Sequence, residues 1–574
     1  MKRKTLTTAV MAGLTGMAGM MSVANAVNVN PDGLGQVLLY PYYTARGGND
    51  TLISVVNTTS AGKAVKIRFL EALNSREVLD FNIYLSPFDV WTAAITDFER
   101  SGIEDPDGGA FGLMTGDTTC TAPYIYDRDF NGNDPAEGDG VQRFVDFRFA
   151  SEPFENPTGP DFAGTLDGGP TDIERTASGY IEIIEMGTMV AQPDPLDGAP
   201  DSGEDAIVPW NTKHVAGEPR DCGAIVDLWR APAPGDSAGP GELGFWETVD
   251  PTFGFEDAPN AFSGGLFGSA SIINVTEGLM FSYNATALDS FWAATTPVNH
   301  TSPGTIRPQL WDATATEANA FINGSISTTN WAAPGPFAVN AAITLDQLMN
   351  EFSINTGDLL GRTEWVLTFP TKARHVDTTP GSPNPSGLDN AIPPFTGLWT
   401  AEEPFSCDTQ DFAFWDREEG PEAGPTQPGD PGDVIISPPP PPTPGTPPPT
   451  GFQLCREANV VRFSNEGTLP EETEIFGEPL RLDSAGEVDR LSYTNFGLPE
   501  GVISGWVQFD FSGFTSFAPA NADGDVITGL PVIGFSANTF TNNDIGDGIR
   551  ASFGGSFKHR GTRTIAQPAS MPQP

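Results

Sequence analysis

The stretch Val65-Lys-Ile-Arg-Phe69 alternates apolar with charged residues, and the same alternation returns in Leu79-Asp-Phe-Asn-Ile-Tyr-Leu85. Successive side chains of a β-strand point to opposite faces, so a period of two predicts strands with one buried face and one face in water. Asn74-Ser75, between the two stretches, favours a turn. Together these features predict an antiparallel strand pair.

The same alternation continues along the chain and predicts its fold class. Further runs occupy residues 179–185, 270–274, 279–283, 364–369, 459–463, 506–511 and 532–535. Helical signals are few, and the strongest is Thr344-Leu-Asp-Gln347, a capping box that predicts a short helix packed on a sheet. We therefore predict a mainly β protein of antiparallel β-sandwiches, immunoglobulin-like in its N-terminal part, with few short helices.

Composition divides the chain into segments. Long stretches rich in Asp, Gly and Pro separate the strand groups, and loops of such length are binding elements or insertions. The predicted segments are a signal peptide at 1–26, an N-terminal sandwich part at 27–100, a β-rich body with loop insertions at 101–418, a proline-rich external loop at 419–451, and a C-terminal segment at 452–574 that completes the body.

The N-terminus has the three parts of a secretory signal peptide. Lys2-Arg-Lys4 is a basic start, residues 6–23 are mostly apolar, and Ala24-Asn-Ala26 offers a small-residue cleavage site. The apolar stretch is too short and weak for a spanning helix and no second long run follows, so we expect no transmembrane segment. The sequence predicts an exported protein, extracellular or on the cell surface, with the periplasm as the alternative.

Acidic residues dominate the charge of the chain. There are 29 Lys and Arg against 75 Asp and Glu, a formal net charge of −46, and loss of the signal peptide would make it −49. Such a field repels nucleic acid, which argues against nucleic-acid partners, and it favours solubility. Hydrophobic residues make up 38% and aromatic residues 10% of the chain, too many for a disordered polyanion.

The four cysteines show no metal-binding spacing, and an even number in an exported chain favours disulfides. Of the three possible pairings, sequence-adjacent pairing is the simplest. We therefore predict bridges between Cys120 and Cys222 and between Cys407 and Cys455. The first bridge would tether the loop-rich insertion at its base.

The second bridge bears on the proline-rich tract 437–450. Bridged Cα atoms lie within about 7 Å of each other, so this bridge would hold the two ends of the tract together. A linker between independent domains would not be held in this way. We predict a stiff external loop, at the tip of a hairpin between residues 412–415 and 459–463.

The acidic segment 127–139 has part of the spacing of a calcium loop. Ca²⁺ takes six to eight oxygen ligands, and D-x-D-x-N-G places three side-chain oxygens around a tight turn. Gly138 stands where an EF-hand has its bidentate glutamate, so the alternative is a solvated acidic turn. Residues 521–525 and 542–547 are weaker versions. The candidate calcium ligands are Asp127, Asp129, Asn131, Asn133, Asp134 and Glu137.

Candidate catalytic residues are weakly supported. Ser237 lies in Gly-Asp-Ser-Ala-Gly-Pro, which resembles the nucleophile motif of trypsin-like proteases, but His214 precedes it by only 23 residues and prolines surround it. Glu182 and Glu185 have the residue type that glycoside hydrolysis needs, yet such a pair has little specificity among 75 acids.

The histidines and tryptophans favour structural roles. We predict that each of the four histidines is a surface or locally bonded residue, because no two have the spacing of metal ligands. Tryptophans in strand patterns are predicted to be core residues, although exposed ones would suit a sugar-binding face. These tryptophans are Trp91, Trp365 and Trp506.

The start of the mature chain carries one resemblance. Residues 30–43, Asn-Pro-Asp-Gly-Leu-Gly-Gln-Val-Leu-Leu-Tyr-Pro-Tyr-Tyr, and the following 51–58 resemble the start of a group of exported proteins of Gram-negative bacteria. The resemblance implies a surface or extracellular setting and carries over no catalytic residue.

These observations favour a non-enzymatic structural or adhesive protein of the cell surface, for instance part of an appendage or matrix. Its partner would be itself, or a glycan or protein of the surface. One alternative is a secreted polysaccharide-binding protein or glycoside hydrolase. Another is a surface module stabilised by calcium.

Overall fold

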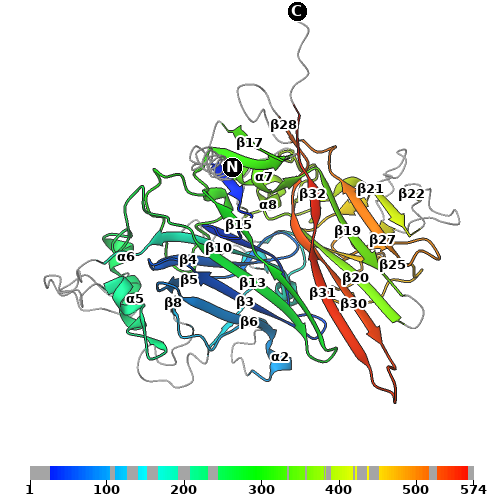
Figure 1. Ribbon diagram of the computed structural model, residues 1–574, viewed down its shortest axis with the longest axis horizontal. Helices are drawn as coiled ribbons and strands as arrows, with labels where there is room; N and C mark the ends of the chain where they lie inside the picture. Colours follow the sequence, from blue (N-terminus) through cyan, green and yellow to red (C-terminus); the bar gives the residue numbers. More distant parts are fainter. Residues whose placement is uncertain are drawn as a thin grey trace, which may run out of the picture.

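The protein is a mainly β chain with several antiparallel sheets and few short helices, as the alternation predicts. Figure 1 shows two sandwiches side by side, the first mostly blue to green and the second light green to red. The computed structural model describes residues 26–103, 110–123, 125, 140–150, 166–191, 207–230, 244–322, 324–331, 335–355, 359–380, 382, 390–417, 421–422, 436–437, 452–515 and 526–566.

The first sandwich packs a nine-stranded sheet against a six-stranded sheet. In spatial order the nine strands are β17 (Ser325–Asn330), β16 (Glu317–Ile322), β1 (Ala26–Val29), β15 (Thr286–Asp289), β2 (Val37–Thr44), β10 (Ser178–Thr188), β4 (Lys63–Glu71), β5 (Glu77–Leu85) and β8 (Cys120–Ala122). The six strands are β14 (Leu279–Asn284), β13 (Leu266–Asn274), β3 (Asn49–Asn57), β6 (Val90–Asp97), β7 (Phe111–Met114) and β9 (Val141–Arg143). Ile67 and Phe81 from the first sheet share a buried core with Ile53 and Trp91 from the second.

This sandwich extends far beyond residues 27–100. β10 lies between β2 and β4, and β13 and β15 come from residues beyond 260, so distant segments complete both sheets. The expected immunoglobulin-like identity is not confirmed. The two sheets, of nine and six strands, together contain more strands than a whole immunoglobulin domain, which has seven to nine.

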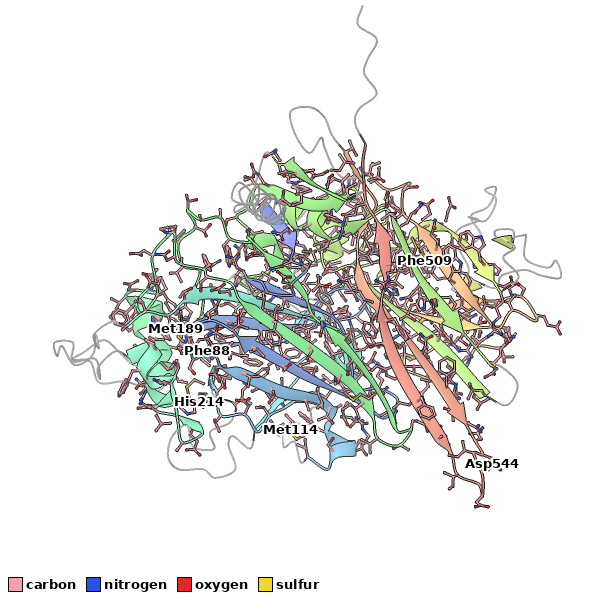
Figure 2. The ribbon with its side chains drawn as sticks, viewed as in Figure 1. Phe88, Met114, Met189, His214, Phe509 and Asp544 are labelled. Atoms are coloured by element: carbon pink, nitrogen blue, oxygen red, sulfur yellow. A yellow bond between two sulfur atoms is a disulfide. The ribbon has the colours of Figure 1, made fainter. Side chains whose placement is uncertain are left out.

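The second sandwich also has two sheets. One contains β22 (Pro421–Glu422), β21 (Asp408–Asp416), β27 (Ser504–Asp510), β19 (Gln347–Ser353) and β32 (Arg560–Thr562), with β24 (Phe452–Leu454) paired to β21. The other contains β23 (Ile436–Ser437), β26 (Thr494–Gly497), β25 (Ala458–Ser464), β20 (Leu359–Thr368), β30 (Ile533–Asn542) and β31 (Ala551–Lys558). Trp365, Phe463 and Phe509 pack in the core between them, where Figure 2 labels Phe509.

The two sandwiches share a buried junction. The opposite face of the β20 sheet contributes Val366 and Phe535 to the core of the first sandwich. The loop 473–478 lies in this junction, where the Phe476 ring packs 5.1 Å from the Tyr42 ring. The carboxylate of Glu364 accepts hydrogen bonds from the backbone of residues 475 and 476, which fixes the loop to β20.

The polar face of β4 and β5 does not lie in water, contrary to the prediction. Lys66 pairs with Asp80 at 2.9 Å, and Arg68 pairs with Glu77 at 2.7 Å and with Glu182 at 2.6 Å. Every residue of β4 is buried. The segment 301–304 covers this face, and its backbone bonds to Lys66 and Asp80. Alternation indicates which residues share a face, but only a distant segment decides whether that face is solvated.

The remaining elements are short. The helices are α2 (Phe98–Ser101), α3 (Phe147–Ala150), α4 (Ile207–Asn211), α5 (Cys222–Arg230), α6 (Phe245–Thr248), α7 (Pro336–Ile343), α8 (Lys372–Val376) and the 3₁₀ turns η2 (Ile173–Ala177) and η3 (Leu310–Asp312). Two-stranded ladders join β11 (His214–Val215) to β12 (Glu218–Pro219), β18 (Thr344–Leu345) to β29 (Leu530–Pro531), and β28 (Val526–Thr528) to β33 (Thr564–Ala566). In the part of the chain that the structure describes, no helix combines the length and apolarity needed to cross a bilayer.

The predicted helix from Thr344 is wrong. Helix α7 ends at Ile343, and residues 344–345 and 347–353 form β18 and β19. The Thr344 hydroxyl donates to the carbonyl of Asn340 at the end of α7, so it does not cap the start of a helix. Leu348 and Phe352 fit both periods because a spacing of four also repeats on one face of a strand.

Both predicted disulfides are present, with Cα separations of 5.2 Å for Cys120–Cys222 and 3.9 Å for Cys407–Cys455. The first ties α5 to β8. The second lies beside the pairing of β21 with β24, in which residues 408–410 pair with 452–454. The predicted hairpin between 412–415 and 459–463 is therefore wrong in both strands, because 412–415 pairs with β27 and 459–463 pairs with β20 and β26. Except for β22 and β23, the predicted loop 419–451 lies outside the described residues.

Candidate functional site

The predicted calcium ligands, Asp127 to Glu137, lie outside the described residues, as do Ser237 and the segment 521–525. The weaker candidate 542–547 is described and forms the turn between β30 and β31, where Figure 2 labels Asp544 at the tip. There Oδ1 of Asp544 accepts from the backbone of Gly546 and Gly548. Within the described ranges, no group of three His, Cys, Asp or Glu side chains is arranged to hold a metal ion.

His300 is locally bonded, as predicted. Its Nδ1 lies 3.2 Å from the carbonyl of Pro251, which can only accept, so Nδ1 carries the proton. Nε2 then accepts from the Tyr84 hydroxyl at 2.9 Å, and that oxygen accepts from Trp229 Nε1 at 2.7 Å. Burial lowers the pKa of His300 to about 3, so the ring is neutral and both nitrogens are occupied.

Two further histidines, His375 and His559, are also buried, neutral and locally bonded. His375 accepts from the Asn340 amide and donates to the carbonyl of Ile392, and His559 donates to the carbonyl of Val366. Burial lowers the pKa of each to about 4. His214 is half-buried, and its Nδ1 lies 3.6 Å from Asp89.

The suggested glycosidase carboxylates are bound in separate ion pairs. Glu182 pairs with Arg68 at 2.6 Å and Glu185 with Lys63 at 2.7 Å, and all four side chains are buried. Glu182 and Arg68 line a small hollow of about 40 Å³, which suits water better than a sugar ring. The Glu185 carboxylate also accepts hydrogen bonds from the backbone of Ser263 and Gly264, so it holds β10 to the segment that covers it.

One of the three predicted core tryptophans is a surface residue. Trp91 and Trp365 are buried, but Trp506 is 37% exposed on β27 and stacks on Trp415 of β21, with ring centroids 3.9 Å apart and an interplanar angle of 12°. In the ladder Glu351 lies on the other side of Trp506. The second sandwich thus presents a flat aromatic pair beside a carboxylate.

A larger feature is the outward side of the six-stranded sheet. Leu52 on β3 lies between Ala94 on β6 and Ser271 on β13, which places it in the middle of this side. The row continues to Ser282 on β14 and to Met114 on β7, which Figure 2 labels. We name the outward side of this sheet, from the row of Leu52 to the row of Val56, the uncharged face.

Two further rows toward Val56 are uncharged, whereas the row on the other side of Leu52 contains Asp50. The row on one side of Leu52 contains Asn284, Ser269, Ser54 and Thr92, and the next contains Phe267, Val56 and Val90. Exposure alternates along β3 and β13, so these side chains point outward. The hydroxyls of Ser271 and Ser282 form a hydrogen bond of 2.8 Å with each other, so they need fewer hydrogen bonds from water.

Charges border this surface. Asp50 pairs with Arg100 at 2.6 Å at one end, and Asp117 accepts from the backbone of Thr92 at the other. Between these ends lies a shallow hollow of about 610 Å³, lined by β3, β6, β7 and β13. Exposed Leu52 and Met114 make it an apolar surface without charge, which suits protein association better than catalysis.

The sequence contains a signal for this face. Apart from Asp50, the outward positions of Asn49–Asn57 and Leu266–Asn274 hold Leu, Ser, Val, Phe and Ile, where the strands β4 and β5 hold Lys, Arg and Asp. The comparisons with known proteins add nothing to this geometry, because no protein-family model, curated protein or solved structure matches the chain.

Proposed function

We propose that the protein is a non-enzymatic structural or adhesive protein of the extracellular space or cell surface, which associates with copies of itself through the uncharged face. The observation that supports this is the lack of charge in the three rows from Leu52 to Val56, on a chain with a net charge of −46. Elsewhere two copies would oppose like charges, which disfavours contact. The uncharged face avoids that cost.

The size of the face suits a modest interface. The five strands β14, β13, β3, β6 and β7 are four to nine residues long. At about 4.8 Å between strands and about 3.3 Å per residue they cover roughly 600 Å². Two copies would then bury about 1,200 Å² in total, at the lower end of specific protein interfaces. Sheets that pack face to face lie about 10 Å apart, and the small serine and alanine side chains allow that approach.

Sedimentation velocity tests this proposal. The wild-type chain should associate at protein concentrations up to roughly 100 μM, above the micromolar Kd of weak specific interfaces. Association should strengthen with salt, because added ions screen repulsion between the acidic surfaces. Leu52→Glu places a charge in the centre of the face and should leave a monomer.

The matched control is Leu482→Glu, which makes the same change at an exposed loop residue of the second sandwich. It should associate like the wild type. A wild-type chain that stays monomeric at every concentration and salt level, or two variants that behave alike, would contradict the proposal.

The stacked pair Trp415–Trp506 supports a second function, binding of a polysaccharide. Flat aromatic rings offer an apolar surface to a sugar ring, and Glu351 beside them can accept hydrogen bonds from its hydroxyls. Retention of the protein on insoluble polysaccharides would test it. Trp506→Ala should abolish retention, whereas Trp210→Ala, which removes a half-buried tryptophan stacked on Arg220, should not.

The calcium-stabilised alternative rests on Asp127 to Glu137 alone. A rise in melting temperature with calcium, absent from a variant with Asp127→Asn and Asp129→Asn, would support it.

A further inference from the structure

A pocket of about 570 Å³ lies where the two sandwiches meet. One wall belongs to β1, β15 and the β16–β17 hairpin of the first sandwich, and the other to β18, β19 and β30 to β32 of the second. Most of its lining is apolar and includes Val29, Phe321, Ile326, Ile343, Leu348 and Ile533. The volume falls within the range of small-molecule sites, which favour junctions between domains.

The charged residues of the lining are both basic. Lys558 at the end of β31 and Arg563 after β32 line the pocket, and no Asp or Glu does. Arg563 donates to the carbonyls of Thr344 and Ala342 at 3.0 and 3.4 Å. Two cations at an apolar pocket are unusual in a chain with 75 acids and 29 bases.

These two cations differ from the buried bases elsewhere. Lys63 pairs with Glu185 at 2.7 Å, and Lys372 pairs with Asp408 at 3.2 Å. Across the described chain, neither Lys558 nor Arg563 has a carboxylate within ion-pair distance.

The carboxylate of Asp346 acts on Arg563 from beyond ion-pair distance, where its charge favours the guanidinium. That carboxylate accepts hydrogen bonds from the hydroxyls of Thr562 and Thr564. The pKa of Lys558 is lowered by its partial burial and by the charge of Arg563, so the two cations repel each other. An anion between them would relieve that repulsion.

We propose that this pocket binds a single-chain amphiphile with an anionic head, of the fatty-acid class. The hydrocarbon tail lies along the apolar walls, and the carboxylate lies between Lys558 and Arg563. Phe321 and Ile326, at 65% and 49% exposed, lie on the first-sandwich wall, where a tail would cover them. The net negative charge of the chain does not prevent binding, because physiological salt screens distant charges over about 8 Å.

Displacement of a fluorescent fatty acid, 11-(dansylamino)undecanoate, from the purified chain tests the proposal. Hexadecanoate should displace it in a saturable way. Octanoate should bind more weakly than dodecanoate, because each further buried methylene raises the affinity by up to about fourfold. Hexadecanol should bind more weakly than the acid, and hexadecyltrimethylammonium more weakly still.

Variants locate the site. Lys558→Gln should weaken the affinity for hexadecanoate about fivefold or more, as expected for the loss of one partly exposed charged contact. Arg560→Gln, two residues away on β32 and outside the pocket lining, should bind like the wild type. Ala320→Trp, which fills part of the pocket, should abolish binding while the melting temperature stays near that of the wild type.

Three results would overturn the proposal. The first is a wild-type chain that shows no saturable displacement. The second is equal binding of hexadecanol and hexadecanoate, which would remove the role of the cations. The third is an equal effect of Lys558→Gln and Arg560→Gln.

Discussion

The hydroxyl of Tyr42 donates a hydrogen bond of 2.6 Å to the carboxylate of Glu478, a residue 436 positions further along the chain. The other carboxylate oxygen accepts from Arg456 at 2.6 Å. Tyr42 belongs to β2 of the first sandwich, whereas Glu478 follows β25 of the second, and all three side chains are buried. One carboxylate therefore joins the two sandwiches.

Removal of the Tyr42 hydroxyl should weaken this junction. Hydrogen bonds to a buried charged group contribute about 1.5–3 kcal/mol, so Tyr42→Phe should lower the free energy of unfolding by that amount. Tyr40→Phe is the matched control, because the Tyr40 hydroxyl donates to the neutral carbonyl of Ser54 within the first sandwich. Tyr40→Phe should lower the free energy of unfolding by about 1 kcal/mol. Urea unfolding followed by fluorescence measures both, and equal losses would contradict the prediction.

Glu478 should also contribute to the pH dependence of stability. Burial alone would raise its pKa, but the charges of Arg456 and Arg46, together with hydrogen bonds from Ser178 and Tyr42, outweigh burial and hold the pKa at about 2. A carboxylate with a lowered folded-state pKa stabilises the fold above its unfolded pKa, and this contribution is lost as the pH falls from about 4.5 to 2. Glu478→Gln should therefore cost about 3 kcal/mol at pH 7 and less at pH 3. A constant cost across this range in pH-dependent urea unfolding would contradict the assignment.

Acid should also destabilise the protein through His300. Its folded-state pKa of about 3 lies below the ordinary value of 6.5, so the unfolded chain binds the proton first as the pH falls. The stability present above pH 6.5 is then lost toward pH 3, by about 3 kcal/mol between pH 7 and pH 4. His300→Gln cannot titrate and should show a drop smaller by about that amount. The half-buried His214, changed to Gln, is the control and should leave the drop near its wild-type size.

The bridge between Cys407 and Cys455 should stabilise the second sandwich. It closes a segment with a sequence separation of 48 residues, and the loop-entropy model gives about 4 kcal/mol for a loop of this length. The double variant Cys407→Ser, Cys455→Ser should lose about that much in urea unfolding. Hydrogen exchange should rise in β24, which is held to β21 by a short pairing beside the bridge. Unchanged protection of residues 452–454 would contradict this view of the hairpin.

Several local features follow from the sequence because their causes are local. The alternation in Val65-Lys-Ile-Arg-Phe69 forces neighbouring side chains to opposite faces of β4, and Ile67 lies in the core as that pattern requires. The cysteine pairing also follows from order along the chain, since adjacent partners close the shortest loops. These features need no knowledge of distant segments.

The candidate sites depend on contacts that no local pattern contains. Trp506 and Trp365 occupy similar strand patterns, yet one is exposed and the other buried, because only Trp365 lies between two sheets. The helix predicted from the capping box at Thr344 is wrong for a similar reason. The segment pairs as strand β19 with β27, about 160 residues away, and no local pattern contains that partner.

The sequence by itself determined that the chain is mainly β and which residues share a strand face, and it favoured the cysteine pairing that the structure shows. Only the tertiary structure decided that the Lys66 face is covered by residues 301–304, that the Leu52 face is not, and that Lys558 and Arg563 meet an apolar pocket without a carboxylate. The physical reason is that a strand's period fixes the direction of each side chain, whereas burial and charge balance depend on segments brought together from the whole chain.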